Sequence, residues 1–132
     1  MNEEMSKIFS LKGKNIWVLG GAGYLGKYTV MLLHEMGAKL LCVDLENRAE
    51  LFKGSIRFSY HIETTPLDVR DGVAIKPFVA KKIKRFGIPD GLVNLTFAFT
   101  ASKLEDISEK EFDQVNHGGL TSAFLLSGEV GS

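Results

Sequence analysis

A run of seven residues containing four glycines, Gly20-Gly21-Ala22-Gly23-Tyr24-Leu25-Gly26, constrains the fold of this chain more than any other feature. The apolar run at residues 16–19 comes directly before it and is typical of a buried strand. Apolar residues at helical spacing then run to Met36, and Gly37 provides a stop signal. A second apolar run at residues 39–43 ends at Asp44. The sequence therefore predicts a strand, a tight turn, a helix and a parallel strand.

The rest of the chain continues this alternation of strands and helices. We expect a short helix over residues 49–53, a third strand over 56–60, a helix from Pro77 to Gly87 and a fourth strand over 91–95. Ser108 and Glu111 form a capping-box signature before a last helix. Such alternation implies a parallel sheet with right-handed crossovers. We therefore expect one α/β domain over residues 1–132 with a polar lead over 1–14. Its fold would be a Rossmann-like, doubly wound parallel sheet of about four strands, with helices on both faces and apparently truncated.

Charge and cysteine content narrow the class of partner. Sixteen basic residues balance sixteen acidic ones, which argues against nucleic acid and against an anionic membrane surface. Residues 1–7 lack an apolar signal region, and the single cysteine, Cys42, favours a reducing compartment. We therefore expect a cytoplasmic protein without a membrane span. The histidines are too scattered to suggest a metal site.

The glycine run carries the main functional hypothesis. A helix amino terminus offers unpaired N–H groups and partial positive charge to a pyrophosphate. Gly20 would make the turn, Gly23 would let the backbone approach the phosphates, and Gly26 would let the helix pack closely, with Tyr24 and Leu25 completing the turn. The alternative is a glycine-rich turn that only connects two elements.

An acid follows at the place where a dinucleotide site needs one. Asp44 lies 18 positions beyond Gly26, where a carboxylate can accept both hydroxyls of an adenosine ribose. Its charge would repel a 2′-phosphate, which favours NAD over NADP, although Arg48 nearby weakens that preference. The alternative for Asp44 is a solvated acid at a strand end.

With these residues in place, the chain resembles the amino-terminal half of the short-chain dehydrogenase/reductases over most of residues 11–130. The resemblance is carried by residues 11–26, by Asp44, by Leu-Asp-Val at 67–69 and by Leu-Val-Asn at 92–94. It implies a Rossmann sheet that binds NAD(P), usually in dimers or tetramers. It also implies that Asp68 and the backbone of Val69 contact the adenine, and that Asn94 stabilises the central strands beside the cofactor. The alternative for Asp68 and Asn94 is a buried polar side chain satisfied by backbone groups.

The chain departs from that family in several places. Leu19 stands where threonine is usual, and Tyr24 where glycine is frequent, which brings the turn nearer to the family's extended branch. Residues 95–97 are Leu-Thr-Phe where Asn-Ala-Gly is common. Gly119 takes the place of a catalytic-site asparagine, for which Asn116, one turn earlier, is a possible substitute. The pair Gly118 and Gly119 implies either a close approach of another helix or of substrate, or a helix that bends or breaks there.

The family's catalytic serine and Tyr-x-x-x-Lys pair have no counterpart in this sequence. Its tyrosines are followed four positions later by Tyr28, Leu32 and Thr64. We therefore expect the cofactor-binding half of an oxidoreductase that cannot transfer hydride by itself. A full-length relative would act on a small-molecule substrate, and this half would self-associate or pair with a carboxyl-terminal portion. The alternatives are a non-catalytic dinucleotide-binding or interaction module and, third, a fragment of an S-adenosylmethionine-dependent methyltransferase.

Overall fold

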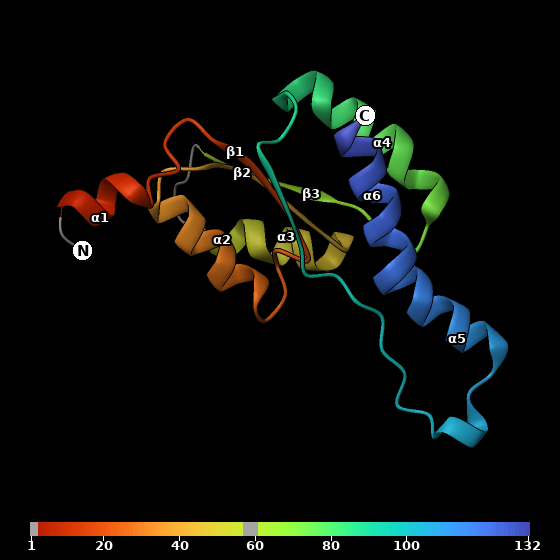
Figure 1. Ribbon diagram of the computed structural model, residues 1–132. Coiled ribbons are helices and arrows are strands. Elements are labelled where there is room, and N and C mark those ends of the chain that lie inside the picture. Colours follow the sequence, from red (N-terminus) through yellow and green to blue (C-terminus); the bar gives the residue numbers. More distant parts are fainter. Residues whose placement is uncertain (1–2, 57–60) are drawn as a thin grey trace.

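A four-stranded parallel sheet forms the centre of the molecule (Figure 1). The computed structural model describes residues 3–56 and 61–132. The strands are β1 (Asn15–Leu19), β2 (Lys39–Asp44), β3 (Ile62–Pro66) and β4 (Gly91–Asn94), and their order in the sheet is β3-β2-β1-β4. All three pairings are parallel. This arrangement confirms the expected α/β, Rossmann-like class.

Helices cover both faces of the sheet. On one face lie α2 (Gly26–Glu35) and α3 (Glu46–Ser55), and on the other lie α4 (Gly72–Phe86) and α6 (Ser122–Gly131) (Figure 1). The chain moves outward from β1 to β2 and β3, then returns past β1 to form β4. Because crossovers between parallel strands are right-handed, this reversal of direction moves the following helix to the opposite face.

The alternation of side chains along the strands produces a core on each face. On β1, Trp17 and Leu19 pack with Ile75, Val79 and Leu126 on the side of α4 and α6. The intervening β1 residues and alternate residues of β2 pack against α2 and α3 on the other side, where the buried set includes Ile16, Val18, Val30, Leu40, Cys42 and Phe52. Every residue of β1 is buried, as expected for a central strand.

The strand order fixes where a ligand can bind. The helical connections leave β1 in one direction and the later chain reaches β4 in the other, so the sheet has its topological switch point between β1 and β4. Leu19 pairs with Val43 on one side and with Asn94 on the other, which brings the carboxyl ends of these strands together. In open α/β sheets, ligands bind in the crevice outside such ends.

The helix expected from Pro77 begins earlier than predicted. Helix α4 starts at Gly72, because Asp71 caps it by accepting hydrogen bonds from the N–H groups of Val73 and Ala74. Pro77 therefore lies inside the helix, where it removes one donor but does not end it. The prediction of the end was correct, since Gly87 follows the helix with a φ of 81°.

Two other predicted boundaries also differ. The third strand was expected over 56–60, but Ile56 is the C-cap residue that follows helix α3, residues 57–60 lie outside the described part, and the strand in the structure is Ile62–Pro66. The expected polar lead contains a short helix, α1 (Glu3–Ile8). No helix in residues 3–56 or 61–132 combines the length and apolar character that crossing a bilayer requires.

The last predicted helix is present but changes its winding. The capping box of Ser108 and Glu111 starts α5 (Glu109–Asn116), after the 3₁₀ turn η1 (Leu104–Asp106). A π-helical segment, η2 (His117–Thr121), joins α5 to α6. A Cβ on Gly118 would overlap Ala98 of the preceding loop, whereas one on Gly119 would meet nothing. The glycine at 118 thus permits close approach of a loop rather than of a second helix.

Candidate functional site

The glycine run forms a tight turn between β1 and α2. Gly20 has a φ of 76°, and a Cβ there would lie 2.9 Å from the carbonyl carbon and oxygen of Leu95 at the end of β4. A Cβ on Gly26 would overlap the carbonyl oxygen of Gly20. The N–H groups of Gly20 and Gly21 both donate to the Val43 carbonyl, at 2.7 and 3.3 Å. The turn is therefore held against the ends of both neighbouring strands.

The start of α2 has no side-chain cap. Leu25 occupies the N-cap position and makes no side-chain cap, so no side chain among the described residues satisfies the first turn in that way. The residues of the turn before Tyr24 have no side chain large enough to cover that terminus, and Tyr24 itself is 81% exposed. Such a terminus, with its partial positive charge, suits a phosphate.

Asp44 is fastened to the glycine turn. As a whole residue, Asp44 is 7% exposed. Oδ2 accepts the N–H of Ala22 at 3.0 Å, and Oδ1 accepts the N–H of Leu45 at 2.8 Å. Each oxygen thus receives one backbone N–H and keeps capacity for a second donor, because a carboxylate has about four acceptor positions in all.

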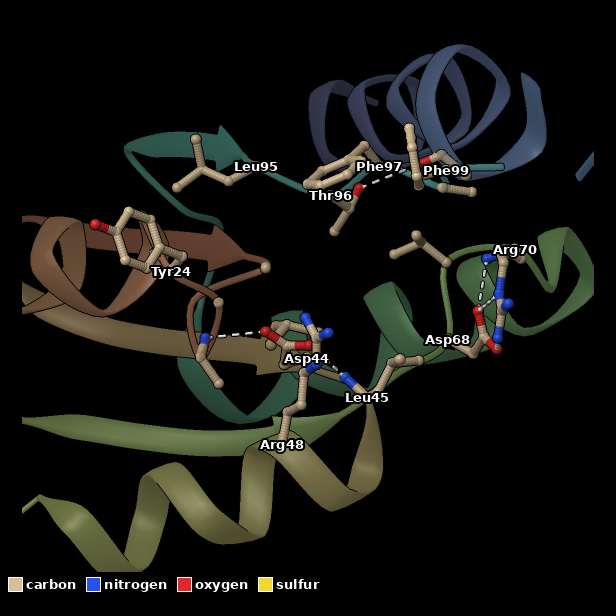
Figure 2. Close-up of a pocket in the computed structure, with 18 of the residues that line it drawn as sticks. Tyr24, Asp44, Leu45, Arg48, Asp68, Arg70, Leu95, Thr96, Phe97 and Phe99 are labelled. Carbon is tan, nitrogen blue, oxygen red and sulfur yellow. Dashed lines mark hydrogen bonds and ion pairs between the residues drawn. The ribbon is translucent and has the colours of Figure 1, made fainter. Parts of the chain in front are cut away.

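A cleft of about 1020 Å³ opens along this edge of the sheet. Figure 2 shows Asp44 and Arg48 on one side, residues 95–99 across from them, Tyr24 at one end, and Asp68 with Arg70 at the other. Eight of the nine residues predicted to bind cofactor line this cleft: Gly20, Gly23, Tyr24, Leu25, Gly26, Asp44, Asp68 and Val69. The structure therefore brings the sequence-predicted residues into one place.

The ninth, Asn94, is not among the residues that line the cleft. Its Oδ1 accepts hydrogen bonds from the N–H of Thr96 at 3.1 Å and from the Thr96 hydroxyl at 2.6 Å. Thr96 itself lines the cleft. Asn94 thus orients the chain as it leaves β4, in agreement with a structural role beside the site.

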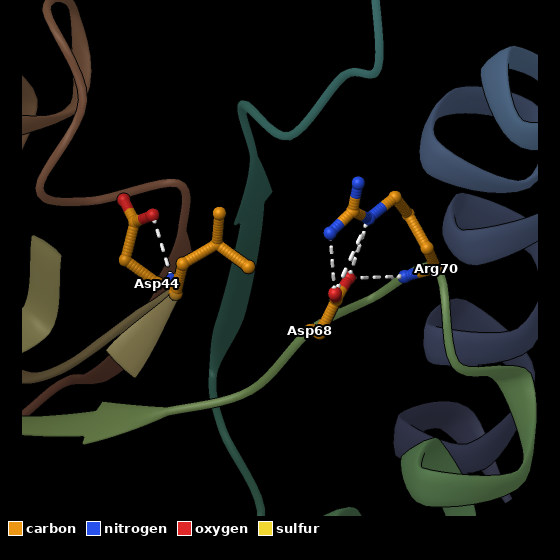
Figure 3. A network of polar contacts seen from close by, with 4 residues as sticks. Asp44, Asp68 and Arg70 are labelled. Carbon is orange, nitrogen blue, oxygen red and sulfur yellow. Dashed lines mark hydrogen bonds and ion pairs between the residues drawn. The ribbon is translucent and has the colours of Figure 1, made fainter. Parts of the chain in front are cut away.

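Asp68 is paired with a residue that the sequence reasoning missed. Arg70 donates from its backbone N–H to Oδ1 at 3.0 Å, and its Nε and Nη2 reach the two carboxylate oxygens at 2.6–3.2 Å (Figure 3). The Arg70 side chain lowers the pKa of Asp68, first through its hydrogen bonds, so the carboxylate is an anion in this pair. The only sequence signal for this ion pair was the placement of an arginine two residues after an aspartate in Asp-Val-Arg.

The loop after β4 is tied to α5 at the opposite wall. Glu111 Oε1 accepts from the hydroxyls of Thr100 and Ser102, while Oε2 accepts from the N–H and hydroxyl of Ser108. These hydrogen bonds, led by that from the Ser108 backbone, lower the pKa of Glu111 to about 2. Further along, Ala98 rests on Gly118. The loop is thereby fixed at two points, and Phe97 and Phe99, which line the cleft, are each 79% exposed.

Cys42 lies beneath the turn, where its buried thiol is unreactive. A Cβ on Gly21 would come within 2.5 Å of its Sγ. Burial, and to a lesser degree the charge of Asp44, raise the pKa of the thiol to about 12. The side chain therefore acts as a small buried group.

Two further expectations concern metal and Asn116. No group of three or more His, Cys, Asp or Glu side chains within the described residues could hold a metal ion. Asn116 donates from its amide to the Phe112 carbonyl of its own helix and is not part of the cleft lining. Its substitution for the family's asparagine therefore has no support in the contacts of its side chain.

Comparison with known proteins agrees with this geometry. The sequence pattern of the short chain dehydrogenases matches residues 14–131. The chain is 29% identical over 119 residues to 3-oxoacyl-(acyl-carrier-protein) reductase of Thermotoga maritima, covering 89% of this chain and 48% of that protein. It is 29% identical over 125 residues to 2,3-dihydro-2,3-dihydroxybenzoate dehydrogenase of Bacillus subtilis, covering 91% and 47%.

Solved structures show the same relation. A short-chain dehydrogenase/reductase of Serratia marcescens superimposes with a TM-score of 0.81 at 26% identity, covering 92% of this chain and 51% of that one. A short chain dehydrogenase of Leptospira borgpetersenii with bound NAD⁺ gives 0.82 at 25% identity, covering 98% and 48%. The chain spans about half the length of these relatives. Because the family pattern extends from before β1 to the end of α6, this chain belongs to the short-chain dehydrogenase family of oxidoreductases.

Proposed function

We propose that this chain is the NAD-binding part of a short-chain dehydrogenase/reductase. The observation that carries the proposal is the hydrogen bond between Asp44 Oδ2 and the N–H of Ala22. It joins the acid suited to a ribose and the turn suited to a pyrophosphate into one rigid unit at the switch point of the sheet. The turn contacts also fit the group, since glycines at 20 and 26 leave no Cβ where backbone segments meet.

The strand order suggests how the dinucleotide lies in the cleft. Its pyrophosphate would meet the amino end of α2, beside β1, and Asp44 at the end of β2 would accept the ribose hydroxyls. The adenine then extends toward Asp68 and Val69 after β3, and the nicotinamide half toward Thr96 after β4.

We further propose that NAD is preferred over NADP. The buried Asp44 carboxylate would face the 2′-phosphate of NADP and repel it. Arg48 also lines the cleft and is the nearby cation that could offset part of this repulsion. Since Asp44 is held by two backbone N–H groups and cannot swing away without losing them, its charge decides the preference.

Calorimetry with NAD, NADP and S-adenosylmethionine in parallel tests the proposal. We expect heat with NAD and weaker binding of NADP, whereas binding of S-adenosylmethionine alone would indicate a methyltransferase. Asp44→Asn should weaken NAD binding by about tenfold or more, because a hydrogen bond to a charged group contributes about 1.5–3 kcal/mol. Asp106→Asn is the matched control, since this exposed acid lies outside the cleft.

Hydride transfer is proposed to need residues beyond those of this chain. The sequence contains no Tyr-x-x-x-Lys, the pair that would exchange a proton with the substrate oxygen. The same observation favours a second candidate, a module that binds the dinucleotide without catalysis. Assay of NAD reduction by this chain alone, and again with the carboxyl-terminal half of a relative added, separates the two: restored turnover supports the dehydrogenase.

We also propose that the chain self-associates or pairs with a carboxyl-terminal portion. Among the described residues β4 pairs on one side only, with β1. Phe112, Leu120 and Phe124 along α5–α6 are each more than 60% exposed. Unpaired edges and clustered apolar side chains favour association. Light scattering over a range of concentrations should show a species larger than the monomer, and a stable monomer throughout would contradict the proposal.

A further inference from the structure

A second concavity, of about 680 Å³, lies near the residues where β2 and β3 begin. It shares no lining residue with the cleft described above. Lys39, the first residue of β2, lines this concavity, whereas Asp44, the last residue of the same strand, lines the cleft. A dinucleotide in the cleft therefore does not account for it.

Positive charge dominates this concavity. Lys39, Lys53 and Arg85 line it, and Glu63 is the only acid among the described lining residues. Lys82 is not part of the lining, but it is 7% exposed and its Nζ lies 3.2 Å from Oε1 of Glu63. Four cations thus accompany one carboxylate, although the whole sequence carries equal numbers of basic and acidic residues. The excess of positive charge is therefore local.

Glu63 is already paired with two of these cations. Its Oε1 accepts a hydrogen bond from Nζ of Lys82, and its Oε2 lies 3.0 Å from Nη2 of Arg85. Within residues 3–56 and 61–132, neither Lys39 nor Lys53 forms an ion pair with a carboxylate. The described part of the chain thus supplies no negative partner for these two ammonium groups.

Three of the cations gather around one aromatic ring. From the centroid of the Phe86 ring, Nζ of Lys39 lies at 4.6 Å, Cζ of Arg85 at 5.8 Å and Nζ of Lys82 at 5.9 Å. The face of an aromatic ring attracts cations, but the ring is neutral and leaves the net charge unchanged. The cations therefore converge on a small region instead of lying in a row.

Helix ends explain only part of this arrangement. Lys53 and Arg85 lie in the last turns of α3 and α4, where a cation offsets the negative end of the helix dipole. Lys39 begins a strand and gains nothing from such a dipole. Its charge is repelled by the neighbouring Lys82 and Arg85. A concave surface lined mainly by one sign of charge attracts ions of the opposite sign.

We propose that this concavity binds a compact, multivalent phosphate group of a small molecule between Lys39 and Arg85. Arg85 pairs with Glu63 through Nη2, which leaves most of its five N–H donors for a ligand. Lys39 adds an ammonium group, and both side chains are of the types by which proteins hold phosphate. A compact anion fits better than an extended acidic peptide because the cations converge on one ring. This inference does not depend on the proposed function.

The test measures the binding of inorganic pyrophosphate by calorimetry, with NAD at saturating concentration so that the glycine turn is not available to the probe. Lys39→Met and Arg85→Met each remove one charge and keep much of the apolar side chain. Lys84→Met is the matched control, because Lys84 is an exposed cation of the same last turn of α4 and does not line the concavity.

We expect saturable binding to the wild type, weakened about tenfold or more in Lys39→Met and in Arg85→Met, the effect of losing one hydrogen bond to a charged group. Lys84→Met should bind within about twofold of the wild type, since an exposed charge away from the ligand contributes little. Three results would each overturn the inference: no binding to the wild type, binding by Lys39→Met within about twofold of the wild type, or equal weakening by Lys84→Met.

Two further measurements complete the test. Lys39→Arg keeps the charge and should restore most of the affinity that Lys39→Met loses, whereas a loss equal to that of Lys39→Met would contradict a role for the charge. A tetraglutamate peptide that binds as tightly as pyrophosphate would overturn the assignment to a compact phosphate. If NAD itself fails to bind, the proposed function is wrong, and comparing Lys39→Met with Lys84→Met without NAD still decides this inference.

Discussion

Replacing Gly26 by alanine should destabilise the chain and abolish dinucleotide binding. The added Cβ would overlap the Gly20 carbonyl oxygen and lie 2.7 Å from the Cα of Gly21 and 2.8 Å from the carbonyl carbon of Gly20. All three are backbone atoms, which cannot rotate away as the end of a side chain can. The turn must therefore shift as a whole.

The cost can be worked from two contributions. Forcing a methyl group into a packed site costs about 1–3 kcal/mol. A shift of the turn also weakens the bond from the Ala22 N–H to Asp44, and a hydrogen bond to a charged group contributes about 1.5–3 kcal/mol. If that bond is lost, the two contributions lower the free energy of unfolding by about 2.5–6 kcal/mol, or roughly 10–24 °C in Tm for a chain of this size.

Urea unfolding followed by the fluorescence of Trp17, the single tryptophan of the chain, measures this change. Gly54→Ala is the matched control, since Gly54 is exposed in α3 and an added Cβ there would meet nothing. That variant should be up to about 1 kcal/mol more stable, because alanine is the better helix former. If Gly26→Ala unfolds at the same urea concentration as the wild type, the close packing of Gly26 against the turn backbone does not contribute to the stability of the fold.

Three shorter predictions concern other described residues. Cys42 should resist alkylation at neutral pH in the folded chain, because burial raises its thiol pKa to about 12, and should react once urea unfolds the protein; fast native labelling would contradict its burial. Trp17→Phe should change the unfolding free energy by less than about 1 kcal/mol, measured by circular dichroism, since the lost packing is offset by removal of an indole N–H that has no acceptor among the described residues. Glu111→Gln should be less stable than the wild type above pH 4.5, and this difference in unfolding free energy should shrink as the pH falls from 4.5 toward about 2. The reason is that the folded-state pKa of Glu111 is lowered, so its carboxylate stabilises the fold fully above the ordinary pKa of 4.5 and stops doing so once it is protonated. A stability difference that does not change with pH would show that the charge is not involved.

Much of the fold was predictable because local patterns and tertiary structure agree. The apolar runs at β1, β2 and β4 are short and end in glycine, aspartate or asparagine, and all three strands lie where they were expected. The capping box of Ser108 and Glu111 is local chemistry and is present as predicted. Such features depend on neighbours in sequence, and no distant contact overrides them.

The errors arose where distant packing or a capping side chain decides the outcome. Pro77 suggested a helix start, but the cap at Asp71 and the burial of Ile75 extend α4 toward its amino end. Strand β3 contains Glu63, two threonines and Pro66, so its alternation of apolar and polar residues is weak. Its position is set by pairing with β2. The pattern of residues 56–60 could not reveal that pairing.

For the candidate site, the sequence predicted the residues on the glycine turn and at the strand ends but missed their mutual contacts. Arg70 was not singled out because an arginine after a strand is common on surfaces, and only its geometry shows that it pairs with the carboxylate of Asp68. The tether of Thr100 and Ser102 to Glu111 joins residues 9–11 positions apart across a loop. Sequence patterns carry no information on hydrogen bonds that close a loop in this way.

Asp44 holds the glycine turn and is also the acid that we propose binds the ribose, which has a consequence for engineering the nucleotide preference. A designer who wishes to admit an extra phosphate would ordinarily replace this acid with a small neutral residue. Here the same exchange leaves the Ala22 N–H without its acceptor and loosens the glycine turn, which we propose holds the pyrophosphate. A successful redesign would therefore keep a hydrogen-bond acceptor at position 44 and introduce the new positive charge elsewhere. Arg48, which already lines the cleft, is the residue beside which to place it.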